Sequence, residues 1–118
     1  LSDAALNILY ELRVENRKMS QKELGEALSL SKQTVNSAIK TLETMGIVEI
    51  PPSLDGGKTK LIEFTSSGEK FAVEKIDKII EAERTAFAAL PSALAENMLT
   101  TVRQYYDIFV EEAKQIEF

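Results

Sequence analysis

The sequence contains no cysteine and no histidine among its 118 residues. Without cysteine there is no disulfide, no thiolate nucleophile and no thiol that senses oxidants. Without histidine the commonest general base is missing, and the two absences together remove the usual zinc ligands. The remaining carboxylates, hydroxyls and lysines form no nucleophile–base pattern, and acidic pairs such as Glu111 and Glu112 are typical of a solvated face. We therefore expect no enzyme, no metal and no cofactor.

Aromatic residues and long apolar runs are scarce as well. Aromatics make up 7% of the chain and tryptophan is absent, so the core must be built from aliphatic side chains. No apolar run approaches the ~18 residues that cross a bilayer, and there is no signal-peptide pattern. The length is that of one domain. We expect a cytoplasmic protein that does not associate with membranes.

The formal net charge of −5 is unevenly distributed. Residues 61–118 carry a net charge of −5 and residues 1–17 carry −1, whereas residues 18–60 carry +1. The lysines of the middle segment fall at expected helix starts and in one loop, where phosphates could meet them. This distribution permits DNA binding without establishing it, because an ordinary solvated surface explains the lysines equally well.

Residues 20–45 contain two helix starts eleven residues apart, at Ser20 and at Ser31. Ser20 and Glu23 form a capping box, and Gly46 supplies the residue that ends the second helix. The apolar positions expected to be buried are Leu24, Ala27 and Leu28 in the first helix and Val35, Ala38, Ile39 and Leu42 in the second. The link over residues 28–31 allows only a tight turn, so the pattern predicts a helix-turn-helix.

The residues after Gly46 have strand and turn signals. Residues 47–50 are rich in β-branched side chains and predict a strand, which Pro51 and Pro52 end. Turn chemistry at residues 55–57 precedes a returning strand over residues 59–64. Two strands joined by a turn directly after a helix-turn-helix indicate a winged helix with a two-stranded wing, in a mainly α (α+β) fold.

Three further helices are expected, one over residues 2–17 and two long ones over residues 65–90 and 92–116, with a break at Pro91. Each long helix exceeds the mean of about 11–12 residues, and its apolar positions cover more than one stripe. A small winged helix cannot cover that surface, so we expect a homodimer; an intramolecular bundle is the alternative. We divide the one continuous domain into a DNA-binding region, residues 1–65, and a helical dimerisation region, residues 66–118.

The order of these pieces resembles the MarR family of winged-helix transcription regulators. The matching segments are residues 20–28 (family type Ser/Thr-x-x-Glu-Leu-Ala-x-x-Leu), 31–42, 43–49 and 61–68. The long helix pair broken by Leu-Pro-Ser also looks like the family's closing section. The resemblance implies a homodimer that binds double-stranded DNA at a palindromic operator. It also implies a small-molecule effector bound between the dimer helices and the winged domain.

Two features depart from the family pattern. The family usually has an arginine in the wing that reaches the minor groove, and here Lys58 or Lys60 would take that role. Lysine lacks the planar fork of arginine, so a weaker or less selective contact is implied. The family usually also has a helix before the one that starts near Ser2. That helix is not in this chain, which leaves the full extent of the dimer open.

Helical geometry identifies the residues expected to face DNA. With the apolar stripe turned inward, Gln33, Asn36 and Ser37 point outward and are of types that meet base edges in a major groove. Lys32 and Lys40 are expected at phosphates. The expected DNA-binding set is Ser20, Gln21, Lys22, Ser31, Lys32, Gln33, Thr34, Asn36, Ser37, Lys40, Lys58 and Lys60. For each residue alone, an exposed polar side chain with no partner is an equally good interpretation.

A different function fits the same fold. A winged helix can serve protein–protein assembly without specific DNA binding. The acidic pI of about 4.8 and the presence of lysine in place of arginine in the wing favour this alternative. The residues that would bind an effector are not identified. Tyr10, Tyr105 and Tyr106 are candidates to line its pocket, although core packing is the commoner role for a tyrosine.

Overall fold

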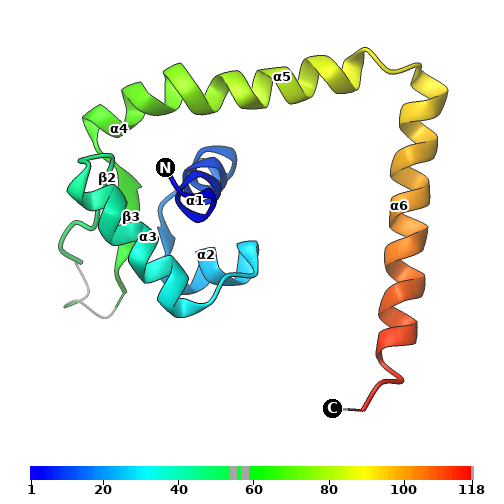
Figure 1. Ribbon diagram of the computed structural model, residues 1–118, viewed down its shortest axis with the longest axis horizontal. Helices are drawn as coiled ribbons and strands as arrows, with labels where there is room; N and C mark the ends of the chain where they lie inside the picture. The colour runs from blue at the N-terminus through cyan, green and yellow to red at the C-terminus, as the bar shows by residue number, and fades with distance from the viewer. Residues whose placement is uncertain (54–55, 57–58, 118) are drawn as a thin grey trace. The chain divides into compact units, whose positions relative to one another are not determined.

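The computed structural model describes residues 1–53, 56 and 59–117, which form two compact units, Leu1–Ile79 and Ile80–Phe118. The elements, most of them labelled in Figure 1, are α1 (Asp3–Glu15), β1 (Met19–Ser20), α2 (Gln21–Leu28), α3 (Lys32–Thr44), β2 (Val48–Glu49), β3 (Leu61–Phe64), α4 (Ser66–Phe71), the π-helix η1 (Ala72–Ile76), α5 (Asp77–Ala88) and α6 (Ser92–Ala113). The predicted winged helix-turn-helix is confirmed. Asp55 and Lys58 of the expected wing turn lie outside the described residues.

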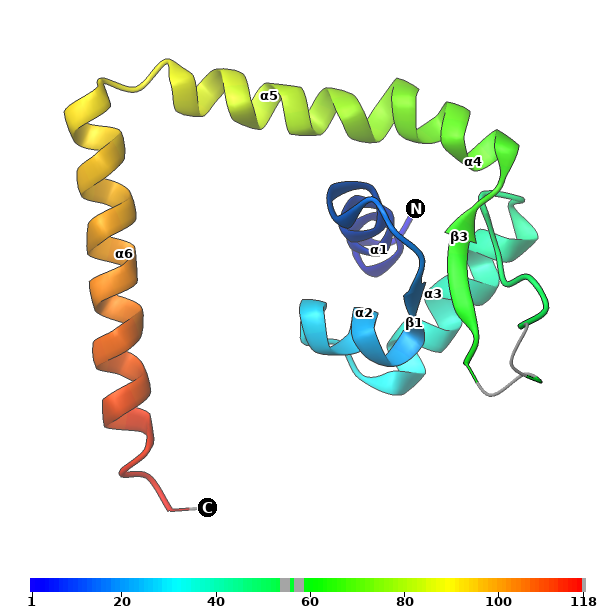
Figure 2. The ribbon, with the colours of Figure 1, turned by 180° about the vertical axis from the view of Figure 1, so that it is seen from behind.

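The core of the first unit is built around α1, which contacts α2, α3 and η1 (Figure 2). Ile8, Leu9 and Leu12 of α1 are buried. The other buried apolar side chains of this unit are Ala5, Met19, Leu24, Val35, Ala38, Ile39, Leu42, Ile47, Val48, Ile62, Ala72 and Ile76. This core is aliphatic, as the scarcity of aromatic residues predicts.

The wing belongs to a three-stranded antiparallel sheet in the order β1-β3-β2. The two-stranded wing is β2 and β3, and β1 adds a strand that the sequence pattern does not show. In the register, Glu49 of β2 lies opposite Glu63 of β3. Lys18 offsets this like-charge pair with an ion pair of 3.0 Å to Glu63.

Three expectations need correction. Ala27 of α2 is exposed and Leu28 only half-buried, so α2 buries Leu24 alone. The wing strands are shorter than residues 47–50 and 59–64. The long helix expected over residues 65–90 contains a π-helical stretch and ends at Ala88.

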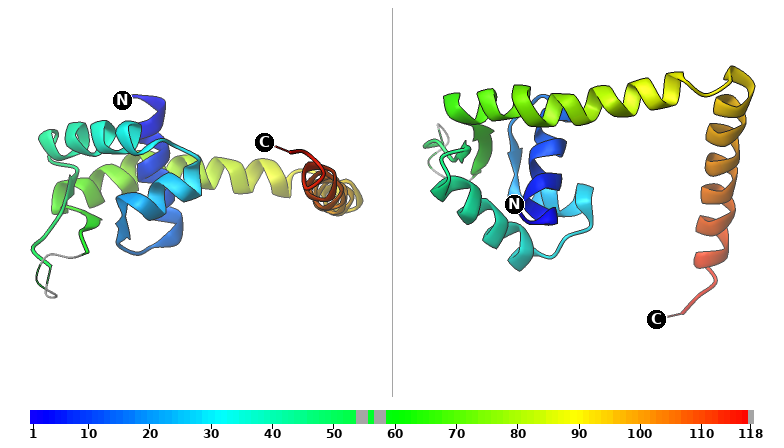
Figure 3. Two further views of the ribbon diagram at one scale, coloured as in Figure 1. Left: turned by 90° about the horizontal axis from the view of Figure 1, so that it is seen from below. Right: turned by 45° about the horizontal axis from the view of Figure 1, so that its top comes forward.

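The second unit consists of the rest of α5 and α6, and Figure 3 shows α6 as one continuous helix. Among the described residues of this unit, Ala95 is the one that is buried. The exposed large apolar side chains of α6 are Leu94, Met98, Leu99, Val102, Tyr105, Tyr106, Ile108 and Phe109. Within the second unit, therefore, almost none of the apolar surface of α6 is covered. None of the described helices could span a membrane.

Candidate nucleic-acid interface

The start of α2 is held by the capping box that the sequence predicts. The hydroxyl of Ser20 accepts a hydrogen bond of 3.1 Å from the backbone N–H of Glu23, and Oε1 of Glu23 accepts one of 3.1 Å from the backbone N–H of Ser20. Arg17 adds an ion pair of 2.8 Å to Glu23. The Ser20 hydroxyl is thus committed to the fold, while the other N–H groups of the first turn of α2 lack a partner within the helix, as at any helix N-terminus.

The turn between α2 and α3 is tight, as expected. Ser29 adopts the left-handed conformation with φ of 55°, and the backbone N–H of Leu30 donates to the carbonyl of Gly25 at 3.0 Å. A Cβ at Gly25 would lie 3.2 Å from the carbonyl oxygen of Leu30, so a residue with no side chain lets the turn approach α2 closely. This closeness fixes α3 relative to α2.

The first turn of α3 is ordered by two hydroxyls. Ser31 Oγ accepts a hydrogen bond of 3.2 Å from the backbone N–H of Thr34 and donates one of 2.8 Å to Thr34 Oγ1. Ser31 therefore acts as the helix cap. Its predicted contact with DNA, like that of the other members of the set, stays a prediction.

The outer face of α3 is polar and left uncovered by the described part of the chain. Val35, Ile39 and Leu42 are buried on one side, and the expected base-reading residues Gln33 and Ser37 are exposed on the other. Gln33, Thr34 and Ser37 line a surface hollow of about 390 Å³ together with Ser2 and Thr41. Sequence reasoning missed Thr41, although its spacing of four residues from Ser37 places both on one face. It also missed Ser2, which only the tertiary fold brings here.

Asn36 differs from its neighbours because it is half-buried. The side-chain Nε2 of Gln21 donates to Oδ1 of Asn36 at 3.5 Å, a long hydrogen bond that joins α2 to α3. The remaining hydrogen-bonding capacity of the Asn36 amide includes both of its N–H donors. Two residues predicted separately are thus paired by the fold.

The lysines of this face have no acidic partner among the residues that the structure describes. Lys22 and Lys32 flank a hollow of about 380 Å³ between α2 and the start of α3, and Lys40 is exposed farther along α3. Lys60 is exposed at the base of the wing, beside a hollow lined by Pro51 and Pro52. Lys58 lies outside the described residues. The set therefore gathers on α2 and α3, with Lys60 on the adjoining wing.

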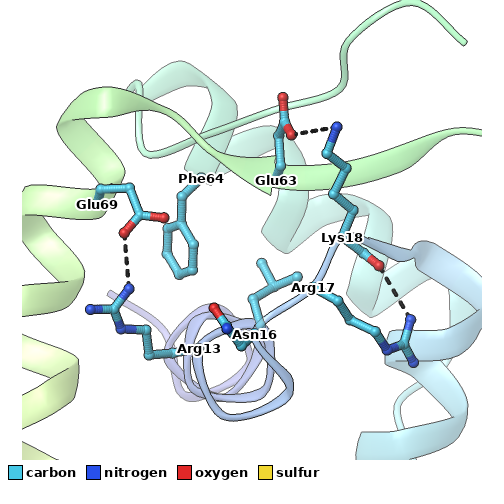
Figure 4. A pocket seen from close by; sticks show the side chains of 8 residues that line it. Arg13, Asn16, Arg17, Lys18, Glu63, Phe64 and Glu69 are labelled. Carbon is cyan, nitrogen blue, oxygen red and sulfur yellow. Dashed lines mark hydrogen bonds and ion pairs between the residues drawn. The ribbon is translucent and has the colours of Figure 1, made fainter.

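A separate pocket of about 180 Å³ lies between the end of α1, β3 and α4 (Figure 4). It is lined by Leu12, Arg13, Asn16, Arg17, Lys18, Glu63, Phe64 and Glu69. Its cations are all ion-paired, Arg13 to Glu69 at 2.9 Å and Lys18 to Glu63 at 3.0 Å, with Arg17 bound to Glu23. None of the three tyrosine candidates is among these lining residues, and Tyr105 and Tyr106 are exposed on α6, where Tyr105 stacks on Phe109.

Acid is expected to weaken the start of α2. The hydrogen bond from the Ser20 backbone and the ion pair with Arg17 hold the pKa of Glu23 below its ordinary value of 4.5. A group with a lowered pKa stabilises the fold above its unfolded pKa, and this contribution is lost as the pH falls through the folded pKa. We predict that the urea midpoint of unfolding falls between about pH 6 and pH 3, and that Glu23→Gln flattens this fall. If the urea midpoints of the two proteins fall in parallel with pH, Glu23 is not the group whose protonation weakens the fold.

Comparison with known proteins agrees with this architecture. The sequence profile of the MarR family matches residues 1–58. Among solved structures, the fold is similar to NMB1585, a MarR family regulator from Neisseria meningitidis, with 23% identity, a TM-score of 0.76, and coverage of 98% of this chain and 80% of that one. It is also similar to the MarR family transcription regulator SP03579, with 17% identity, a TM-score of 0.81, and coverage of 98% and 76%.

A third similar structure is the complex of S. aureus MepR with DNA, at 19% identity and a TM-score of 0.70, covering 92% of this chain and 80% of that one. No curated protein matches the sequence. The structural similarities establish the fold, and the profile match covers the segment that contains the helix-turn-helix. On these grounds residues 1–58 belong to the MarR family, and the whole chain has the winged-helix fold of solved MarR-family regulators.

Proposed function

We propose that the protein is a homodimeric regulator that reads a palindromic site in double-stranded DNA with α3 and responds to a small-molecule effector. One observation carries the DNA-binding part: α3 buries its apolar side completely and leaves a polar side uncovered. Gln33, Thr34 and Ser37 lie on that side, near lysines that have no acidic partner among the described residues. Short polar side chains read base edges and lysines meet phosphates. The DNA complex of the similar protein MepR supports this assignment.

The apolar surface of α6 supports the homodimer. Its exposed apolar side chains recur at steps of three and four residues from Leu94 to Phe109, and at 3.6 residues per turn they spread over about half of the helix circumference. An apolar patch this continuous is rare on a monomeric protein and marks an interface. A second copy of the chain supplies a matching surface, as in most protein oligomers.

The pocket between α1, β3 and α4 supports the proposal of a small-molecule effector. With about 180 Å³ it has room for a small compound, and it combines the apolar side chains Leu12 and Phe64 with three cations. An anionic compound would compete with Glu63 and Glu69 for these cations. The similar regulator PcaV from Streptomyces coelicolor was solved with its natural ligand. Adding benzoate to the DNA-binding assay tests this part of the proposal.

The deciding experiment is a selection from random double-stranded DNA with the effector-free protein. Enrichment of a palindrome supports a dimeric reader of DNA, because two-fold protein symmetry is mirrored in the site. A selection that enriches no sequence favours the alternative, a winged helix that assembles with other proteins.

Asn36→Ala is expected to weaken binding to the selected site by ~1–3 kcal/mol and to relax the preference at one base position, because the proposal assigns Asn36 to base reading. Lys58→Ala serves as the comparison: it should lower affinity about evenly across sequences and flatten the salt dependence. Gel-shift titrations of both variants on the selected site and on single-base variants measure this. Unchanged binding in both variants would show that the surface is assigned wrongly.

A further inference from the structure

One guanidinium binds two carboxylates that lie on either side of the π-helix η1. Arg13 of α1 donates from Nε and Nη2 to the two carboxylate oxygens of Asp77, each at 2.7 Å. Its Nη1 donates to Oε2 of Glu69 at 2.9 Å (Figure 4). Glu69 lies in α4, before η1, and Asp77 is the first residue of α5, directly after it. Arg13 therefore spans η1 as a staple.

The π-helix is the part of this helical run that most needs such support. The backbone N–H of Asp77 donates to the carbonyl of Ala72, five residues earlier. Turns of this kind are rare, occur mainly as single bulges inside α-helices, and are found at functional sites. Ala72 and Ile76 are fully buried, and η1 contacts α1. The apolar side of η1 is thus fixed by packing on α1, and its polar side is bracketed by Arg13.

We propose that Arg13 is a positioning residue: its staple fixes the direction in which α5 leaves the first unit, and thereby the spacing between the two half-sites that a dimer reads. The second half of this inference rests on the proposed function. The first half concerns only the fold, so it can be tested without DNA.

The geometry of the Arg13 ion pairs indicates that they position α5 rather than stabilise the fold. The side chains of Glu69 and Asp77 are 56% and 40% exposed, and ion pairs this open contribute little to stability. A two-pronged arginine–carboxylate pair does, however, fix the relative orientation of the groups it joins. Consistently, Arg13 lowers the pKa of the Asp77 carboxyl, so the pair stays charged at neutral pH. Lysine provides the positive charge but not the planar fork. Arg13→Lys therefore keeps the charge of the pair and removes the two-pronged contact that fixes its orientation.

The first test measures the direction of α5 by distances between spin labels. Since the chain has no cysteine, Thr44→Cys in α3 and Thr85→Cys in α5 place two labels in each chain, both at exposed positions. Labelled protein is diluted with unlabelled protein so that distances within one chain dominate. We expect a narrow distance distribution in this background and a clearly broader one after Arg13→Gln, Arg13→Lys or Asp77→Asn.

Lys18→Gln is the matched control, because it removes an ion pair of the same surface, to Glu63, that does not span η1. Its distribution should stay narrow. Equal widths with and without Arg13→Gln, or equal broadening by Lys18→Gln, would overturn the proposal. Asp77→Asn provides the same test should Arg13→Gln fail to fold. The double exchange Arg13→Asp with Asp77→Arg should restore part of the narrowness.

The second test uses the selected palindrome and versions whose spacer is longer or shorter by one or two base pairs. The unsubstituted protein should prefer one spacer by about tenfold, because each added base pair rotates one half-site relative to the other. Arg13→Gln should lose most of this preference. A retained preference would refute the link to spacing. If the selection yields no palindrome, the proposed function fails, and the label distances still decide whether Arg13 positions α5.

Discussion

Gly68→Ala is expected to destabilise the winged-helix unit by about 3 kcal/mol or more, at the upper end of what overpacking costs. A Cβ at Gly68 would lie 1.8 Å from the carbonyl oxygen of Ile47, 2.9 Å from its carbonyl carbon and 3.2 Å from Cδ1 of Phe64. The nearest atoms belong to the backbone, so no change of side-chain rotamer relieves the contact.

The backbone around Ile47 cannot easily move away. Its carbonyl accepts a hydrogen bond of 3.0 Å from the backbone N–H of Thr65. The hydroxyl of Thr65 in turn caps α4 by accepting from the N–H of Gly68 at 2.9 Å and donates to the carbonyl of Gly46. A shift of α4 away from Ile47 would therefore break the cap and the link between α4 and the entry to β2.

Urea denaturation of Gly68→Ala and of Gly46→Ala tests this argument. Gly46 has φ of 75°, and a Cβ there would meet no atom within 4 Å, so its alanine variant carries only the cost of a left-handed residue, ~1–2 kcal/mol. The Gly68 variant should be the less stable of the two. A Gly68→Ala protein as stable as the unsubstituted one would show that the close approach of α4 to Ile47 is wrong.

The helix-turn-helix was predictable because its signals are local. Ser20, Glu23 and Ser31 act on amides within three residues, and the stripe through Val35 and Leu42 is set by helical periodicity. β1 was not predictable, since two residues that coincide with the cap of α2 have no alternating pattern, and only β3 makes them a strand. Ala27 occupies an apolar position that no neighbouring element of the first unit covers.

The candidate site shows the same division. The outward positions of α3 follow from its inward ones, so Gln33, Ser37 and Lys40 could be named before the fold was known. The pairing of Gln21 with Asn36 joins residues 15 apart, and the bond from Arg13 to Asp77 joins residues 64 apart. Neither pairing has a sequence spacing that would reveal it, because each depends on which helices the core brings together.

Val102→Glu is expected to convert the proposed dimer into monomers. Val102 is 61% exposed near the middle of the apolar surface of α6, which the rest of the second unit does not cover. A dimer contact there would bury the new carboxylate without a partner, which costs about 3–5 kcal/mol and raises the dimer dissociation constant by roughly 200- to 5,000-fold. Gln104→Glu is the matched control: it adds the same charge on the polar side of α6.

Sedimentation at micromolar concentration distinguishes the outcomes. The unsubstituted protein and Gln104→Glu should sediment as dimers and Val102→Glu as a monomer with α1–α3 still folded. The monomer should also bind a palindrome no better than a single half-site, because linking two readers adds affinity only when both engage at once. A monomeric unsubstituted protein would refute the dimer, and a dimeric Val102→Glu would exclude this face of α6 as its interface. The spacing function proposed for Arg13 requires the dimer, whereas its effect on the direction of α5 does not.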